Sequence, residues 1–293
     1  MMSIDTLQER IRKLKNPSVI DFNLLPEHIP SHIQERDTFF PVAYEYFCTE
    51  LLHGMKDIVP GARFSLSNMA LYGADGLNAL KNVLEAAKND GYYVLLDCPE
   101  AYSAQDAIRT AERLLLQESQ FVFDGLVMGA YIGSDAIRPV ADVLSKTDKD
   151  LFVLVRTPNR SASELQDLLT GSRHVHMAAA DLVNRFAETS TGKCGYSQIA
   201  AVMAANHTDS LRNVRNKHKS VFLLIDGYDQ TNANAKNCSH AFDSLGHGAA
   251  ACAGISVTAA WQTCAAESRS FVPFAVEAAE RMKKNLTRYV TIL

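Results

Sequence analysis

The chain has 293 residues, of which 47% are hydrophobic and 21% are charged, and its formal net charge is −4. This length and apolar content are sufficient for one large α/β barrel with a single core. A weakly acidic chain lacks the basic surface that nucleic acids or anionic membranes require of a main partner. We find no apolar run near the length of about 18 residues that a membrane span needs. The amphipathic stretch at 1–16 is not a signal peptide, so we expect a cytoplasmic protein.

Short apolar runs of strand length alternate along the chain with longer stretches of helical period. Strands are expected at 18–23, 62–67, 92–97, 125–130, 151–156, 198–204, 220–226 and 247–254. Helices are expected in 1–16 and at 31–54, 73–91, 103–117, 134–145, 209–218 and 271–287. Consecutive strands lie too far apart for hairpins, which predicts parallel strands joined by crossover connections.

Eight such units closing on themselves form a TIM (β/α)8 barrel, here with an N-terminal helix and longer loops. The alternative is an open doubly wound sheet, but no G-x-G-x-x-G motif follows the first strand. Internal repeats, low-complexity tracts and Pro/Gly-rich linkers are also missing from the sequence. We therefore predict one domain over residues 1–293.

The cysteines and histidines do not form a metal-binding pattern. None of the six cysteines lies in a CxxC pair, and we expect reduced, buried thiols at Cys48, Cys98, Cys194, Cys238, Cys252 and Cys264. Among His174, His176, His240 and His247, no two residues have the i, i+4 spacing of a helical metal site with a nearby acid. We expect surface or hydrogen-bonded core roles for His174, His176, His240 and His247, and no metal or cofactor.

In a TIM barrel, functional residues gather at the carboxyl ends of the strands. Arg63 and Asp97 end neighbouring strands and could meet as an ion pair in the barrel mouth. Alternatively, the two side chains only neutralise each other's charge at the end of the core and have no catalytic role. Gly227 and Gly254 follow the last two strands, where barrels often bind phosphate through backbone N–H groups. Each glycine has the alternative role of permitting a turn.

Several stretches of the chain together resemble a known family. They are NPSVIDFNLLPEHIP (16–30), YGADGLNALKNVLEAAKNDGYYVLLD (72–97), YIGSDAIRPV (131–140), LFVLVRTPNRSASELQD (151–167), GKCGYSQIAAVMAA (192–205), FLLIDGY (222–228) and DSLGHGAAACAGI (243–255). In order and spacing this set resembles the longer-chain bacterial type of orotidine 5′-phosphate decarboxylase, an enzyme of pyrimidine biosynthesis. The resemblance implies a TIM barrel and a homodimer with active sites at the subunit interface.

The catalytic signature of that family, D-x-K-x-x-D, is not preserved. Asp97 matches the first aspartate, but Pro99 stands at the lysine and Tyr102 at the second aspartate, which the family contributes to the partner subunit's site. Decarboxylation creates carbanion character that the lysine ammonium stabilises and protonates. Proline carries neither a charge nor a donor, so the resemblance covers the scaffold and not this chemistry.

Other family positions also differ in this chain. The lysine that ends strand two in the family is Arg63, and the ribose-binding aspartate that ends strand one aligns with Asn23. Near the pyrimidine and phosphate positions, the aligned residues are Thr157, Pro158, Gly227, Thr231, Ala253 and Gly254. Of these, Pro158 replaces a serine, Thr231 a phosphate-binding glutamine, and Ala253 an arginine whose bidentate phosphate contact is lost.

Three hypotheses of different classes follow. The chain is a non-catalytic homologue, paired with itself or with an active paralogue. Alternatively, it is a barrel enzyme with altered chemistry on another ligand, using Arg63, Asp97, Glu100, Tyr102 or Thr157. Thirdly, it is an active decarboxylase with a lysine supplied from elsewhere, the candidates being Lys81, Lys88 and Lys193.

Overall fold

Eight parallel strands close into a barrel in a computed structural model that describes residues 2–98, 103–116, 119–263 and 270–293. Around the barrel the strands follow the order β1-β10-β9-β8-β5-β4-β3-β2. Their bounds are β1 Ser18–Asp21, β2 Gly61–Ser65, β3 Tyr93–Asp97, β4 Gly125–Gly129, β5 Asp150–Leu154, β8 Ile199–Ala204, β9 Leu223–Asp226 and β10 Ala249–Ala253. The predicted TIM barrel is confirmed, and its closure excludes the open doubly wound sheet.

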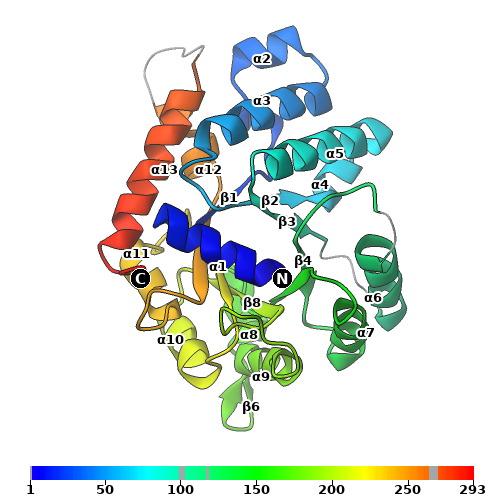
Figure 1. Ribbon diagram of the computed structural model, residues 1–293, viewed down its shortest axis with the longest axis vertical. Helices are drawn as coiled ribbons and strands as arrows, with labels where there is room; N and C mark the ends of the chain where they lie inside the picture. The colour runs from blue at the N-terminus through cyan, green and yellow to red at the C-terminus, as the bar shows by residue number, and fades with distance from the viewer. Residues whose placement is uncertain (1, 99–102, 117–118, 264–269) are drawn as a thin grey trace.

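Helices surround the strands as an outer ring (Figure 1). The longer ones are α3 Phe40–Met55, α5 Gly73–Asn89, α6 Ala104–Ala111, α7 Ser134–Leu144, α9 Val175–Ala187, α10 Thr208–Lys217 and α13 Val272–Thr287. The shorter ones are α2 Ser31–Arg36, α4 Leu66–Ala70, α8 Ser163–Gln166, α11 Ala235–Cys238 and α12 Ile255–Thr258. A π-helical turn, Glu112–Leu116, extends α6, and 3-10 turns cover Pro26–His28, Arg160–Ala162, Ser239–Ala241 and Ala260–Thr263.

The helix expected at 31–54 is two helices, which is a correction with a clear local cause. The chain between α2 and α3 is extended at Phe39, and Pro41 occupies the first turn of α3. Proline lacks the N–H that a continuing helix would need and restricts the residue before it, so it starts a helix rather than continuing one.

The segment between β5 and β8 contains structure that periodicity did not predict. It holds α9 and a two-stranded antiparallel hairpin, β6 Leu169–Thr170 and β7 Arg173–His174. Gly171 in the hairpin turn has φ +65°, a conformation that glycine adopts without steric cost. Strands of two residues are too short to show an alternating pattern.

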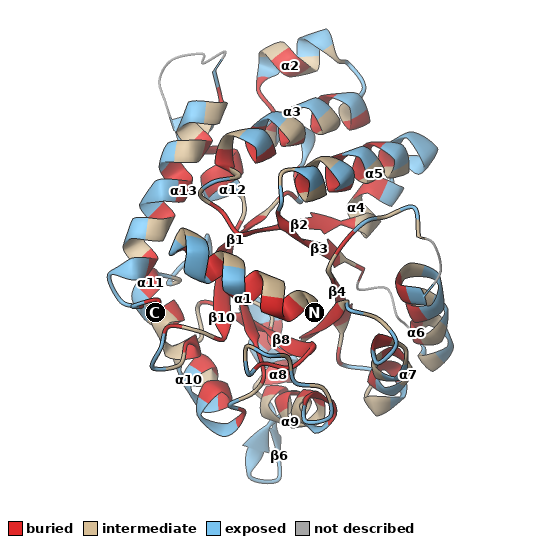
Figure 2. Ribbon diagram, viewed as in Figure 1, coloured by how far each residue is buried: buried red, intermediate tan, exposed pale blue. Residues whose placement is uncertain are grey.

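The N-terminal helix, α1 Ser3–Leu14, closes one end of the barrel. Leu7 packs beside Gly61 at the start of β2, and the Gln8 Oε1 accepts a hydrogen bond of 3.1 Å from the Gly248 N–H, just before β10. The barrel strands between the helices are buried (Figure 2). Because α1 covers the amino ends of the strands, the polar residues at their carboxyl ends define the open mouth.

The expectations for cysteines and histidines agree with the structure wherever it describes them. Five cysteines are free, and four of them are buried, whereas Cys194 is half-buried; Cys264 lies outside the described residues. The four histidines each have a hydrogen-bond partner, namely His174, His176, His240 and His247. Within the described ranges, no helix is long and apolar enough to cross a membrane.

Candidate functional site at the barrel mouth

Arg63 lies at the centre of the barrel mouth and contacts aspartates from three strands. Its Nη2 is 2.7 Å from the Asp97 Oδ2, and its Nη1 is 3.0 Å from the Asp226 Oδ1 and 3.9 Å from the Asp21 Oδ2. The side chain is only 8% exposed. The Arg63–Asp97 pair expected from the sequence is therefore present, but as part of a larger cluster with two further acids.

The strand register explains why these residues meet. Asp21 pairs with Arg63 across β1 and β2, and Asp97 pairs with Ser65 across β2 and β3. Asp226 comes from β9, which is separated from β1 by β10. The sequence of β10 is Ala-Ala-Ala-Cys-Ala, and these small side chains leave room for the arginine to reach across.

Burial and charge perturb the titration of this cluster. Burial raises the pKa of Asp21 to about 6, and the neighbouring Asp226 and Asp97 add to the rise, while Arg63 opposes it. Burial disfavours the Arg63 charge, but the three aspartates outweigh burial and raise the pKa of the guanidinium. Burial also raises the pKa of the Cys252 thiol beside them, so the thiol stays protonated at neutral pH.

The aspartate that ends the first strand is Asp21 and not the position assigned to Asn23. The predicted strand extended two residues too far, because β1 ends at Asp21. Asn23 is exposed, and its backbone N–H donates to the Asp21 Oδ1 at 2.9 Å. An aspartate therefore stands at the end of strand one, and Asn23 lies at the margin of the mouth.

A hollow of about 300 Å³ opens at the mouth. Its lining includes Asn23, Pro158, Gly227 and Gly254, all of which the sequence placed near a ligand, together with Asp21 and Asp229. Thr157 and Thr231 are not among the lining residues. The Thr157 N–H and hydroxyl both bind the Gln166 side chain, at 3.0 and 2.8 Å, and Thr231 is exposed.

Asp229 binds the Gly254 N–H, a backbone donor that the sequence analysis assigned to a phosphate, and it also binds Ser256. The Gly254 N–H donates to the Asp229 Oδ2 at 2.7 Å, and the Ser256 N–H lies 3.4 Å from the same oxygen. The Ser256 hydroxyl donates to the other carboxylate oxygen. The Asp229 carboxylate thus lies where a bound phosphate was expected. The spacing of these residues in the sequence does not reveal this contact.

Asp21, Asp226 and Cys252 could together offer ligands to a metal ion, since their donor atoms lie within 4.8 Å of one another. However, the Arg63 guanidinium contacts both carboxylates and already supplies a positive charge there. A divalent cation would have to displace or repel that guanidinium. The residues therefore fit an internal ion-pair cluster better than a metal centre.

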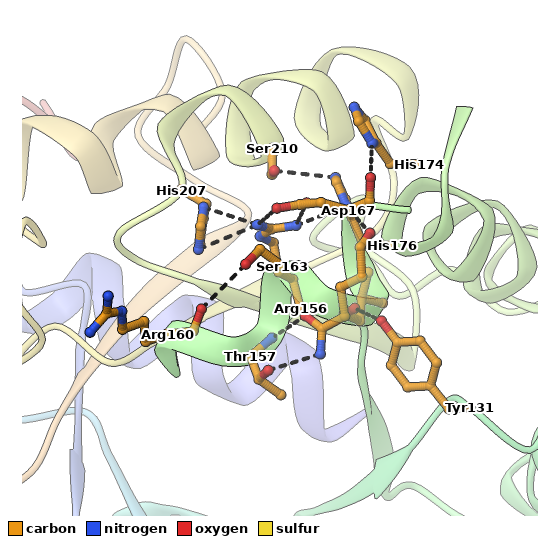
Figure 3. Close-up of polar contacts among 12 residues, drawn as sticks. Tyr131, Arg156, Thr157, Arg160, Ser163, Asp167, His174, His176, His207 and Ser210 are labelled. Carbon is orange, nitrogen blue, oxygen red and sulfur yellow. Dashed lines mark hydrogen bonds and ion pairs between the residues drawn. The ribbon is translucent and has the colours of Figure 1, made fainter. Parts of the chain in front are cut away.

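A second polar cluster lies beside the mouth, where β5 ends (Figure 3). Arg156 is 1% exposed and ion-pairs with Asp167 through both terminal nitrogens. Its Nη1 is 2.9 Å from the His176 Nδ1, and its Nη2 is 3.0 Å from the His207 Nδ1. Burial lowers the pKa of both histidines, and Arg156 lowers it further.

This second cluster fixes the loop after β5. Asp167 follows α8, His176 belongs to α9, and His207 precedes α10, so three segments converge on one guanidinium. The His176 Nε2 lies 3.2 Å from the Ser210 Oγ, which extends the network onto α10. Arg156 is the last residue of the strand predicted at 151–156, but its partners are up to 51 residues away in the sequence, so local spacing does not reveal them.

Three candidate residues of the stretch 97–102, Pro99, Glu100 and Tyr102, lie outside the described residues. The lysines considered as substitutes lie away from the mouth hollow, since none is among its lining residues. The Lys88 ammonium binds both carboxylate oxygens of Asp124 at 2.8 Å. Lys193 lies with Gln8 and Glu9 against α1, at the opposite end of the barrel, and Lys81 belongs to α5.

These features define a (β/α)8 barrel protein with a polar site at the carboxyl ends of its strands. The chain is similar in sequence to curated orotidine 5′-phosphate decarboxylases. That of Petrotoga mobilis is 27% identical over 241 residues, covering 81% of this chain and 82% of the relative. That of Clostridium kluyveri is 28% identical over 245 residues, covering 81% of each chain. No protein-family model matches the chain.

Solved structures agree on the fold. The OMP decarboxylase of Leishmania donovani superposes with a TM-score of 0.73 at 19% identity, over 98% of this chain and 99% of that one. The orotidine 5′-monophosphate decarboxylase of Plasmodium berghei gives a TM-score of 0.77 at 13% identity, over 97% and 98%. At such low identities the superpositions support only the barrel fold. The similarity to decarboxylases in particular comes from the sequence relatives.

Proposed function

We propose that this chain is a single-domain homologue of orotidine 5′-phosphate decarboxylase that has lost the decarboxylation reaction. The relatives and the fold support the scaffold. The loss is inferred from the residues: Pro99 stands at the position of the family's lysine, and Tyr102 at that of its second aspartate. Without a positioned ammonium, the developing carbanion has neither a stabilising charge nor a proton donor.

The observation that carries this proposal is the Asp229 carboxylate on the N–H groups of Gly254 and Ser256. A phosphate bound there would have to displace an internal anion that is already hydrogen-bonded. Ala253, at the position of the family's phosphate-binding arginine, adds no positive charge to compensate. The N–H groups that would bind the substrate's phosphate are therefore already hydrogen-bonded to Asp229.

The charge of the mouth supports the same conclusion. Arg63 contributes one positive charge, while Asp97, Asp226, Asp21 and Asp229 contribute four negative ones, which leaves about three negative charges when all are ionised. A nucleoside monophosphate carries up to about two negative charges at neutral pH. Repulsion at short range in a partly buried mouth opposes its binding.

The test is a decarboxylation assay with orotidine 5′-phosphate at high protein concentration, using protein purified from a host that lacks its own enzyme. We expect no turnover, and no saturable binding of orotidine or uridine monophosphate by calorimetry. Turnover that co-purifies with the chain would refute the proposal and would mean that Pro99 does not occupy the lysine's place.

A non-catalytic barrel could act through association, and the resemblance supports a homodimer or a mixed dimer with an active paralogue. In a mixed dimer, Tyr102 would face the active chain's site in place of the incoming aspartate. We therefore expect a mixed dimer to be less active per active site than the active homodimer. Size-verified mixed dimers assayed with orotidine 5′-phosphate test this, and an unchanged rate would contradict it.

A second function, catalysis on a ligand without phosphate, is favoured by one observation. Asp21 lines the mouth hollow, and its pKa of about 6 lies near neutral pH, as that of a general acid or base should. The hollow of about 300 Å³ would admit a small neutral or cationic ligand. Screening small uncharged and cationic ligands by thermal shift, with Asp21→Asn as the control, would detect such a site.

A further inference from the structure

A hollow of about 360 Å³ lies apart from the barrel mouth, between the loop after β9, α11 and the C-terminal end of α13. The two helices pack side by side near the chain's C-terminus (Figure 1). Its lining consists mainly of two tyrosines, two cations and two amides: Tyr228, Tyr289, Lys236, Arg288, Asn234 and Asn285. None of these residues lines the mouth hollow, so the two sites are separate.

The charge of this hollow is opposite to that of the mouth. No acidic residue belongs to its lining. Lys236 and Arg288 form no ion pair with any residue that the structure describes, although acidic residues outnumber basic ones in the chain by 33 to 29. Two unpaired cations that converge from different elements on one hollow favour an anionic group, and the arginine can bind a phosphate or carboxylate in bidentate fashion.

The aromatic residues add a second requirement. Tyr228 is half-buried and lines the hollow together with Asn285. Tyr289 is 54% exposed, and thus leaves a large ring in solvent. Tyrosine rings stack on planar ligands, and burying an exposed ring gains favourable contact area. The Asn234 and Asn285 amides can orient polar substituents of a ligand.

We propose that this hollow binds a small molecule that carries an aromatic ring and an anionic group, such as an aryl phosphate or a nucleotide-sized ligand. Lys236 and Arg288 hold the anionic group, and Tyr289 packs on the ring. The volume is within the range of about 300–1,000 Å³ that is usual for small-molecule sites. The site does not depend on the function proposed for the barrel mouth.

The test is calorimetric titration of the full chain with 1-naphthyl phosphate, compared with inorganic phosphate and with 1-naphthol. We expect saturable binding of naphthyl phosphate with a Kd at or below about 1 mM, and at least tenfold weaker binding of either part alone. No binding of naphthyl phosphate at several millimolar would overturn the proposal. Equal affinity for inorganic phosphate would overturn the requirement for a ring.

Variants locate the binding. The double variant Lys236→Ala/Arg288→Ala should weaken naphthyl phosphate binding at least tenfold, whereas Lys284→Ala, an exposed α13 lysine that does not line the hollow, should change it less than twofold. Tyr289→Phe should retain binding and Tyr289→Ala should lose it. All four positions are exposed or unpaired, so unchanged thermal unfolding serves as the folding control. Undiminished binding by the double variant would place the ligand elsewhere and refute the assignment.

Discussion

Replacing Asp21 with asparagine should stabilise the protein at neutral pH, although it removes a charged partner of Arg63. Burial and the neighbouring aspartates raise the Asp21 pKa to about 6, so the folded state holds the ionised carboxylate at a cost. Compared with an ordinary pKa of 3.8, this corresponds to roughly 3 kcal/mol above pH 6. Because the side chain is 23% exposed, solvent screening makes that an upper limit.

The sign of the pH dependence follows from linkage. A carboxyl with a raised folded-state pKa binds its proton more tightly when folded, so its destabilising effect is full above about pH 6 and vanishes below about pH 4. Asparagine mimics the protonated carboxyl, and its amide oxygen can keep the hydrogen bond from the Asn23 N–H. Asp21→Asn should therefore unfold at higher urea concentration than the wild type at pH 7.5, and the difference should shrink towards zero at pH 4.

The matched control is Asp97→Asn, which removes the 2.7 Å ion pair with Arg63 and should destabilise the fold. Urea unfolding of the three proteins at several pH values, with free energies of unfolding from linear extrapolation, measures both effects. If Asp21→Asn is less stable than the wild type at pH 7.5, or if the difference does not depend on pH, the assignment of the raised pKa is wrong.

The size of the Asp97→Asn effect can also be predicted, and two further predictions concern Asp229 and His207. Asp97→Asn should lower the free energy of unfolding by about 2 kcal/mol, since it weakens a hydrogen bond between charged groups; a loss below a few tenths of a kcal/mol in urea would contradict it. Asp229→Ala should cost about 1 kcal/mol, because the Gly254 N–H loses its acceptor in an exposed loop; amide exchange should then be faster at Gly254. The folded-state pKa of His207 is lowered, so the wild type should lose stability as the pH falls below about 6.5. His207→Asn removes this titration and should therefore lose less stability on acidification. Equal pH profiles of the free energy of unfolding would argue against this.

The fold could be predicted because each barrel strand is a short apolar run buried on both faces. All eight predicted strands are present, and their boundaries differ from the structure by up to three residues. The signal is weakest at the carboxyl ends, where polar residues begin. The first strand ends at Asp21, two residues before its predicted end at Asn23, the residue aligned with a ribose-binding aspartate. Strand boundaries therefore matter more for the site than for the fold.

The contacts that decide the site could not be read from local pattern. Arg63 and Asp226 are far apart in sequence and meet only because the barrel closes. Asp229 reaches Gly254 across 25 residues, through a loop whose shape no periodicity predicts. By contrast, the break between α2 and α3 has a local signal in the sequence, because Pro41 favours the start of a new helix.

The two hollows differ in the charge of the residues that line them. In the mouth, Asp229 binds the Gly254 N–H, and Ala253 beside it carries no charge. On the outside, Lys236 and Arg288 remain without acidic partners among the described residues. A scaffold can keep its fold through such changes because the core residues of the strands are separate from the polar residues at their ends. A protein that binds an anionic ligand at the outer hollow, and none at the mouth, would account for the positive charge of the first and the negative charge of the second.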